Sequence, residues 1–450
     1  MTDSPVPVQR VDRIGMLDAV RGVAVLGILL MNIIGFGLPD AYEDPTIWGG
    51  HQGANLWAWR ITSLFFEGTM RGLFTLLFGA GALLFLTRAP SRDPSAPSRT
   101  LLYFRRTLLL IAFGLVNGYV LLWEGDILFY YGVTGLALYF FRTLATRTLI
   151  IVGFAILTVP TFMNVAEQRE YVETEQRAAA AQAHIADGSW LSFDGRSAVE
   201  ELQALNANHK PSTSELLYAA ERITDSYASA FRYLKSRTFY WETTFFARFG
   251  FAECLGMMLL GMALLRTGVL TGQASSAMYL SLMLCGYALG LAVNLGEMRH
   301  LESTGFSVRA LLDTHLTYDL GRVAMTFGHV GLLGTLWRFG VFAGAMRTLG
   351  FVGQMALTNY LAQSVIAMFL FTGAGLGLFG ELERYQLYYI VAAIWIAQLA
   401  WSPWWLRRFE FGPMEWVWRT LTYGRMQPLR LREHAAAPVV TPSSQHGTLP

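Results

Sequence analysis

Four titratable residues recur at short intervals in one apolar stretch of the sequence. His315, Arg322 and His329 are seven residues apart. Asp319 follows His315 by four positions. Because seven residues make two helical turns, these groups would share one helix face. Two interpretations stay open. Asp319 neutralises Arg322 in a packing network, or the face lines a cavity in which His315 or His329 acts as a general base, since histidine titrates near neutrality.

Polar residues form similar stripes on two other apolar stretches. Asp18, Arg21 and Asn32 fall on one face of the first, because spacings of 3 and 11 residues bring side chains back into register. Arg106 and Asn117 repeat the 11-residue spacing. The arginines and Asp18 are expected at the inner membrane face, where an anionic headgroup or a phosphate-bearing cofactor could be held. Simple pairing of Asp18 with Arg21 is the alternative.

Other polar side chains stand in or beside apolar stretches, where such groups usually face a partner or a cavity. Asn359 and Gln363 are one helical turn apart, and Asp126 follows a turn between two stretches. A polar chamber that opens outward would explain the groups expected at mid-membrane or in the outer half, which are Asn32, Asn117, Asp126, Glu242, Arg248, Asp319 and Arg322.

The elements that carry these residues are apolar stretches of membrane-spanning length. Hydrophobic residues make up 53% of the 450 positions and charged residues only 15%, which is typical of a chain exposed to lipid. A spanning helix needs about 20 apolar residues. Such windows occur at 15–38, 68–88, 101–123, 127–146, 147–166, 241–266, 273–293, 316–338, 349–372 and 385–406. The sequence therefore predicts an all-α polytopic membrane bundle of about ten spans.

Basic residues predict how the bundle is oriented. Arg and Lys gather in alternate loops and beyond both end spans, so the positive-inside rule places both termini in the cytoplasm. The polar 167–240 segment then faces outward as one larger, helical loop. The predicted parts are bundle 1–166, loop 167–240, bundle 241–408, and a cytoplasmic interfacial helix with a disordered tail at 409–450.

Several kinds of site are not indicated. Cys254 and Cys285 lie in apolar runs and are interpreted as packing residues, and no metal site is predicted. Motifs for phosphate loops, serine hydrolases and zinc proteases do not occur. Basic residues are dispersed along the membrane edges, so no nucleic-acid partner is expected.

Five segments, in chain order, resemble the YeiB-like family of bacterial inner-membrane proteins. They are LDAVRG at 17–22, LFGAG at 77–81, GDIL at 125–128, ALTNYLAQS at 356–364 and FGPMEWVWRTLTYG at 411–424. The resemblance spans nearly the whole chain and implies a multi-pass protein of the bacterial inner membrane. The family is labelled a domain of unknown function, so the resemblance indicates a class and not a reaction.

The chain also resembles, more distantly, the transmembrane acyltransferase superfamily, whose first helix similarly contains Arg-Gly. This resemblance implies transfer of an acyl unit from a cytoplasmic donor such as acyl-CoA to an acceptor across the membrane. In the glycan-modifying members a histidine commonly follows that arginine by 11 positions, whereas this chain has Asn32. An amide cannot accept the proton of an attacking hydroxyl, although it can stabilise an oxyanion. Either His51, His315 or His329 acts as the base instead, or the activity differs.

Three functions remain open at this point. The first is an acyl or group transferase that acts on an envelope glycan, a lipid or a small metabolite. The second is a transporter with an outward-opening polar cavity, and the third is a non-enzymatic scaffold or sensor. The expected partners are membrane lipids and a glycan or small-molecule acceptor, and a homo-oligomer is left open.

Overall fold

The computed structural model describes residues 14–87, 97–186 and 193–431, and these ranges are helical apart from loops and one isolated bridge between Phe409 and Arg430. The predicted all-α membrane fold is confirmed. The first half contains α1 (Gly15–Gly37), α2 (Ala54–Phe65), α3 (Thr69–Thr87), α4 (Arg99–Tyr119), α5 (Leu128–Leu138), η2 (Tyr139–Phe141), α6 (Thr146–Ala186), α7 (Phe193–His209) and α8 (Thr213–Asp225). The second half contains α9 (Tyr227–Tyr240), η3 (Trp241–Gly250), α10 (Phe251–Arg266), α11 (Ser276–Ser303), α12 (Val308–His315), α13 (Tyr318–Arg338), α14 (Ala343–Gln354), α15 (Ala356–Phe371), α16 (Arg384–Leu406) and α17 (Pro413–Tyr423).

Seven helical segments in the described ranges are long and apolar enough to cross a membrane. The count is eight if α14 and α15, which meet at a 75° bend, form one span. The two other predicted windows are also helical. The window 127–146 contains a short apolar helix, Leu128–Phe141. The window 316–338 contains α13, which carries the polar stripe.

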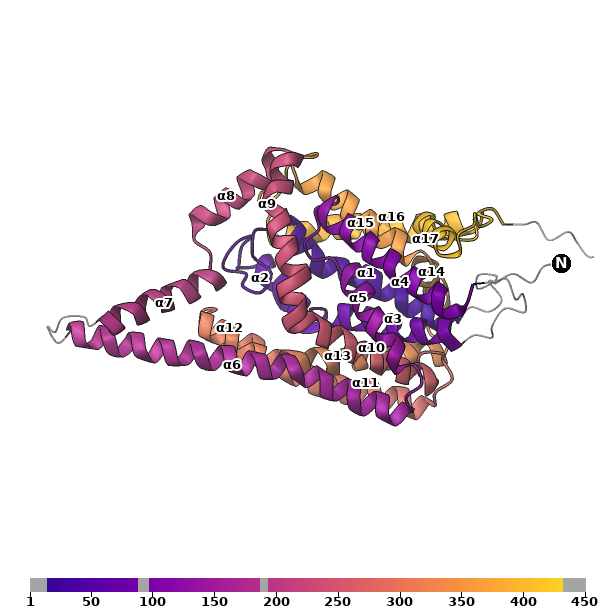
Figure 1. The fold of residues 1–450 in the computed structure, drawn as a ribbon, viewed down its shortest axis with the longest axis horizontal. Coiled ribbons are helices and arrows are strands. Elements are labelled where there is room, and N and C mark those ends of the chain that lie inside the picture. Colours follow the sequence, from indigo (N-terminus) through magenta and orange to yellow (C-terminus); the bar gives the residue numbers. More distant parts are fainter. Residues whose placement is uncertain (1–13, 88–96, 187–192, 432–450) are drawn as a thin grey trace, which may run out of the picture.

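Figure 1 shows two ends of the bundle. The start of α1, α14 and α17 lie at one end, and α2, α7, α8 and α12 lie at the other. α6 is 41 residues long and runs beyond the bundle, where α7 folds back along it. The predicted boundaries at residues 166 and 240 both fall inside continuous helical segments, because α6 passes through the first and α9 continues into η3 at the second.

Glycines allow the central helices to pack with backbones almost in contact. A Cβ on Gly79 of α3 would lie 2.0 Å from the Met258 carbonyl oxygen of α10. A Cβ on Gly22 of α1 would lie 2.0 Å from the Leu349 carbonyl oxygen of α14. Small residues at helix crossings are typical of membrane bundles. The Gly79 segment therefore serves helix packing.

The short helix α17 docks on the bundle at the end where α1 starts. Its Glu415 carboxylate accepts hydrogen bonds from the backbone N–H groups of Leu357 (2.7 Å) and Thr358 (3.0 Å) in the first turn of α15. The first N–H groups of a helix have no partner within it, so the carboxylate caps α15. The predicted disordered tail lies beyond residue 431, outside the described residues.

Candidate functional site

A break between α2 and α3 brings an acidic side chain into the bundle. Residues 66–68 interrupt the helical run, and Gly68 has φ +67°, a conformation that L side chains rarely adopt. A Cβ on Gly68 would also lie 2.5 Å from the Arg322 side chain. The glycine therefore lets the chain turn tightly against α13, with Glu67 beside Arg322.

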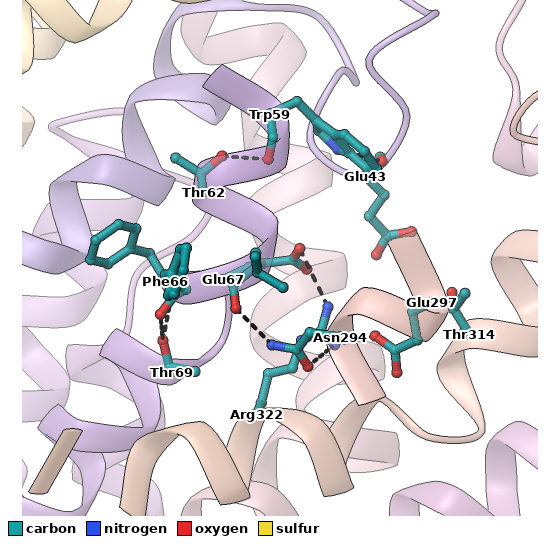
Figure 2. A network of polar contacts seen from close by, with 12 residues as sticks. Glu43, Trp59, Thr62, Phe66, Glu67, Thr69, Asn294, Glu297, Thr314 and Arg322 are labelled. Carbon is teal, nitrogen blue, oxygen red and sulfur yellow. Dashed lines mark hydrogen bonds and ion pairs between the residues drawn. The ribbon is translucent and has the colours of Figure 1, made fainter. Parts of the chain in front are cut away.

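Arg322 is held between two carboxylates. Its Nη1 donates to Asn294 Oδ1 at 3.0 Å and to Glu297 Oε2, both from α11, and its Nη2 lies 3.6 Å from Glu67 Oε2. Figure 2 shows the guanidinium between these groups. The guanidinium also lies over the Tyr318 ring, 4.2 Å from its centroid. Arg322 is 9% exposed, so this is a buried network.

A second ion pair lies on the neighbouring helices α3 and α10. Arg71 donates to both oxygens of Glu253 at 2.8–3.1 Å. Asp319, in the first turn of α13, is half-buried and experiences the charges of Glu253, Arg71 and Arg322. We call the six residues Glu67, Arg71, Glu253, Glu297, Asp319 and Arg322 the outer charge cluster, after the orientation that the basic residues predict. It has four carboxylates and two guanidiniums, so acid is in excess.

His315 stands at the rim of this cluster, on a different helix from the rest of its predicted stripe. α12 ends at His315 and α13 begins at Tyr318, so His315 does not share a continuous face with Arg322. Its Nε2 lies 3.4 Å from Glu43 Oε2 in the loop after α1. Burial would lower the pKa of His315, but the Glu43 carboxylate outweighs this and raises the pKa above its ordinary value.

The other groups at the rim form contacts between the loop after α1 and α7. Lys210, directly after α7, lies 2.9 Å from the buried Asp44 carboxylate. Burial lowers the pKa of the nearby His209, which also experiences the charges of Glu43 and His315. Histidine and carboxylate groups from three separate elements therefore meet beside the outer charge cluster.

His329, the other predicted base, has both ring nitrogens in use. Nδ1 lies 2.8 Å from the Tyr287 hydroxyl and Nε2 lies 2.9 Å from the Phe65 carbonyl oxygen. The ring thus joins α13 to α11 and to the end of α2. This arrangement supports a packing role, because neither nitrogen is left to accept a proton from a substrate.

Asn359 and Gln363 belong to a buried amide network. Asn359 donates to the Val352 carbonyl and to Ser402, and its oxygen accepts from Trp401. Gln363 donates to Gln398 Oε1 at 3.1 Å. These bonds join α15 to α16, so the structure gives both residues the packing role typical of polar groups between membrane helices.

Arginines gather at the opposite end of the bundle. The Arg106 guanidinium lies 3.9 Å from the centroid of the Trp418 ring and 5.5 Å from that of Phe85, and it experiences the like charges of Arg21 and Arg419. Arg21 donates to Asp18 at 3.0 Å, as the pairing alternative predicted. Among the described residues no carboxylate lies within ion-pair distance of Arg106. We call Arg21, Arg106 and Arg419 the inner arginine cluster, again after the predicted orientation.

A cavity of about 410 Å³ opens at the same end, between the start of α1, the end of α13 and α14. Asp18, Trp337, Arg347 and Gln354 are among its lining residues. Drug-sized ligands occupy pockets of about this volume. Asp18 therefore contacts both the cavity and Arg21 of the inner arginine cluster.

Asn32 lies on α1, 11 residues beyond Arg21. It is half-buried on α1 and makes no hydrogen bond to any described residue. Asn117 and Asp126 form a third group: Asn117 Nδ2 donates to Asp126 at 2.7 Å, and the Tyr360 hydroxyl donates to the same carboxylate at 3.3 Å. The predicted residues are thus divided among three groups and the amide network, and Asn32 and His329 belong to none of these.

The sequence interpretation missed Glu67 and the α11 pair Asn294 and Glu297. A signal was present, because Glu67-Gly68 interrupts a long apolar run and Asn294 and Glu297 are three residues apart near the end of another. Ionisable groups in such runs are costly, which marks them as partners for buried arginines.

Comparisons with known proteins find relatives over nearly the whole chain, and the descriptions of these relatives assign no reaction. A family model described as "Protein of unknown function (DUF418)" matches residues 264–425. "Uncharacterized protein YeiB" of Escherichia coli (strain K12) is 30% identical over 417 residues, covering 90% of this chain and 95% of the relative. "Uncharacterized protein YxaH" of Bacillus subtilis (strain 168) is 26% identical over 430 residues, covering 93% and 96%.

Proposed function

From the premise that the chain belongs to the YeiB-like family, we propose that it is a membrane-embedded acyltransferase. It takes an acyl unit from acyl-CoA bound at the inner arginine cluster. It passes this unit to a hydroxyl of an envelope glycan, lipid or small metabolite at the outer charge cluster. The protein spans the bacterial inner membrane with both termini in the cytoplasm, in keeping with its bacterial relatives and with the arginines of alternate loops.

The observation that carries the proposal is the environment of Arg106. A partly buried guanidinium beside two like charges, with aromatic rings on its faces and no carboxylate partner in the described chain, favours an anion. The phosphates of acyl-CoA supply such an anion, and its adenine ring could stack on the aromatic side chains. The adjoining cavity of about 410 Å³ gives room for part of the donor.

Asn32 lies where the thioester would be expected. It is 11 residues beyond Arg21, which corresponds to about 16 Å along a helix at 1.5 Å per residue. The pantetheine arm of acyl-CoA is an extended chain that separates phosphate from thioester. The unbonded amide of Asn32 could donate to the oxyanion that forms when the thioester carbonyl is attacked.

We assign the general base to Asp319. Its side chain is the carboxylate of the outer charge cluster that forms neither a hydrogen bond nor an ion pair with a described residue, and it lies near the like charge of Glu253. A carboxylate oxygen that no donor occupies can accept the proton of a hydroxyl. In the reaction the acceptor oxygen bonds to the acyl carbon as the C–S bond breaks. Asp319 takes the hydroxyl proton, which is returned to the departing CoA thiolate.

The test is acyl-CoA binding and acyl transfer with purified protein. Arg106→Gln should weaken acetyl-CoA binding about 10- to 100-fold, the effect of losing a charge-assisted contact of about 1.5–3 kcal/mol. Arg105→Gln is the matched control, because Arg105 is adjacent and exposed. Asp319→Asn should retain binding but abolish transfer of labelled acetyl to membrane components. No binding of acetyl-CoA by the unchanged protein would refute the proposal.

One observation favours transport as a second candidate. α14 and α15 meet at a 75° bend, and discontinuous helices often form the binding sites of transporters. Proteoliposomes can separate the two functions. Uptake of a labelled solute that is recovered chemically unchanged would support transport, and label recovered on an acceptor would support transfer.

A further inference from the structure

We infer that a monovalent cation binds in a buried pocket of oxygen atoms between α4 and the α9–η3 segment. The residues are Asn117 of α4, Asp126 of the loop before α5, Thr238 of α9 and Glu242 of η3. We call them the oxygen pocket. Neither the acyltransferase proposal nor the transport alternative uses this pocket.

Two carboxylates are buried there without a basic partner. Asp126 is 2% exposed and Glu242 is 4% exposed. No Arg, Lys or His lies within ion-pair distance of either among the described residues. Glu242 experiences the negative charge of Asp126. Because burying an uncompensated charge is costly, a positive charge or a proton must offset this pair.

Hydrogen bonds satisfy the Asp126 carboxylate, so Glu242 is the carboxylate of the pair that still lacks a ligand. Asp126 accepts from Asn117 Nδ2 at 2.7 Å, from the Phe129 N–H at 2.8 Å and from the Tyr360 hydroxyl at 3.3 Å. Glu242 lies beside the Tyr119 hydroxyl, but its Oε1 atom is buried and has no hydrogen-bond partner.

Two more buried oxygens of the pocket lack partners. They are Asn117 Oδ1 and Thr238 Oγ1, and both residues are fully buried. Because the Asn117 amide nitrogen is already used on Asp126, its free oxygen can only accept. Buried polar atoms are nearly always satisfied, so three orphaned oxygens in one region indicate a missing ligand.

Gly118, the neighbour of Asn117 in the chain, allows the Thr238 and Glu242 side chains to lie against α4. A Cβ at this position would lie 2.9 Å from Thr238 Cγ2 and 3.1 Å from Glu242 Oε1. Because residue 118 is a glycine, Thr238 and Glu242, which are one turn apart on the same helix face, can pack against α4. The π-helical turn that starts at Trp241 adds a second indication, because such turns occur often at functional sites.

The donor set fits a small monovalent cation. Carboxylate, amide and hydroxyl oxygens are hard ligands that suit an alkali cation and would offset one of the two negative charges. Ca²⁺ takes six to eight oxygens and Mg²⁺ needs near-ideal octahedral geometry, which is more than these side chains offer. No group of three or more His, Cys, Asp or Glu residues suited to a metal ion occurs in the described part of the chain.

The experiment follows thermal unfolding of the full chain in detergent at pH 8, as NaCl replaces choline chloride at constant ionic strength. The Tm of the unchanged protein should rise with Na⁺ concentration as the site fills. The rise should be about 3 °C when the Na⁺ concentration is 100 times the Kd. Glu242→Gln keeps the shape but removes the charge, and it should abolish the rise. If that variant does not fold, Thr238→Val removes one ligand oxygen and should raise the Na⁺ concentration at half-effect about tenfold.

Glu124→Gln is the matched control, because Glu124 lies close in the chain to Asp126 but already has Arg237 as a partner at 2.7 Å. This variant should keep the full response to Na⁺. A Tm of the unchanged protein that depends on pH but not on Na⁺ would overturn the inference, since the pair would then hold a proton. An equal Na⁺ response in Glu242→Gln would overturn it as well.

Discussion

Replacing Arg322 with methionine should destabilise the protein far more than removing an exposed arginine. The Arg322 side chain is 11% exposed, and its partners Glu67 and Glu297 are each 8% exposed. Methionine would leave two buried carboxylates without a positive charge. Breaking a buried ion pair from one side costs about 3–5 kcal/mol, because the remaining charge is uncompensated. Equilibrium unfolding in mixed micelles measures this cost.

A matched control is Arg309→Gln, which removes the ion pair with Glu175. These side chains are 49% and 35% exposed, so the loss should be about 0–1 kcal/mol. In the double variant Arg322→Met with Glu297→Gln, one stranded carboxylate becomes neutral, and part of the lost stability should return. If Arg322→Met costs no more than Arg309→Gln, the buried network does not carry the energy that we assign to it.

Three further changes test other parts of the structure. Gly79→Ala should cost about 1–3 kcal/mol of unfolding free energy through overpacking, whereas Gly296→Ala, whose Cβ would meet nothing within 4 Å, should be neutral or stabilising. Glu415→Ala should cost about 1–2 kcal/mol, since α15 loses its cap, and proteolysis should release the C-terminal segment sooner. The Glu43–His315 pair should contribute below about 1 kcal/mol, because Glu43 is 49% exposed. His315 has a raised pKa and Glu43 a lowered one. The contribution of the pair to stability should therefore vanish as pH rises through the His315 pKa or falls through the Glu43 pKa. Unfolding measured against pH should show this dependence in the unchanged protein and lack it in His315→Gln.

The sequence predicted the helices well, because apolar length alone identifies a membrane span. It also predicted that Asp18 could pair with Arg21, since the two are one turn apart on one helix. It could not predict that Arg322 faces Glu297 or that Arg71 faces Glu253. Those contacts depend on which helices are neighbours, and this is decided by backbone contacts such as that of Gly79 with α10.

The breaks within helices were the harder feature to predict, and they also contain much of the chemistry. Hydropathy is averaged over a window of residues. A short interruption at Glu67-Gly68 or at Leu316-Thr317 changes this mean too little to show that one helix ends there and another begins. The seven-residue spacing then placed His315 on the face of Arg322, although the two residues belong to different helices. Periodicity describes one helix at a time and fails where the helix stops.

Each break pairs irregular backbone with a polar group, which gives a physical reason for where the candidate sites occur. Non-helical backbone at membrane depth is tolerated only where protein buries it or where it lines a cavity. Glu67 lies in the α2–α3 break, Glu415 caps α15 after its bend from α14, and Glu242 lies in the π-helical turn. A continuous, fully apolar helix that crosses the membrane would contain none of these carboxylates. In these three places the helices are interrupted or distorted where the bundle holds a buried or half-buried carboxylate.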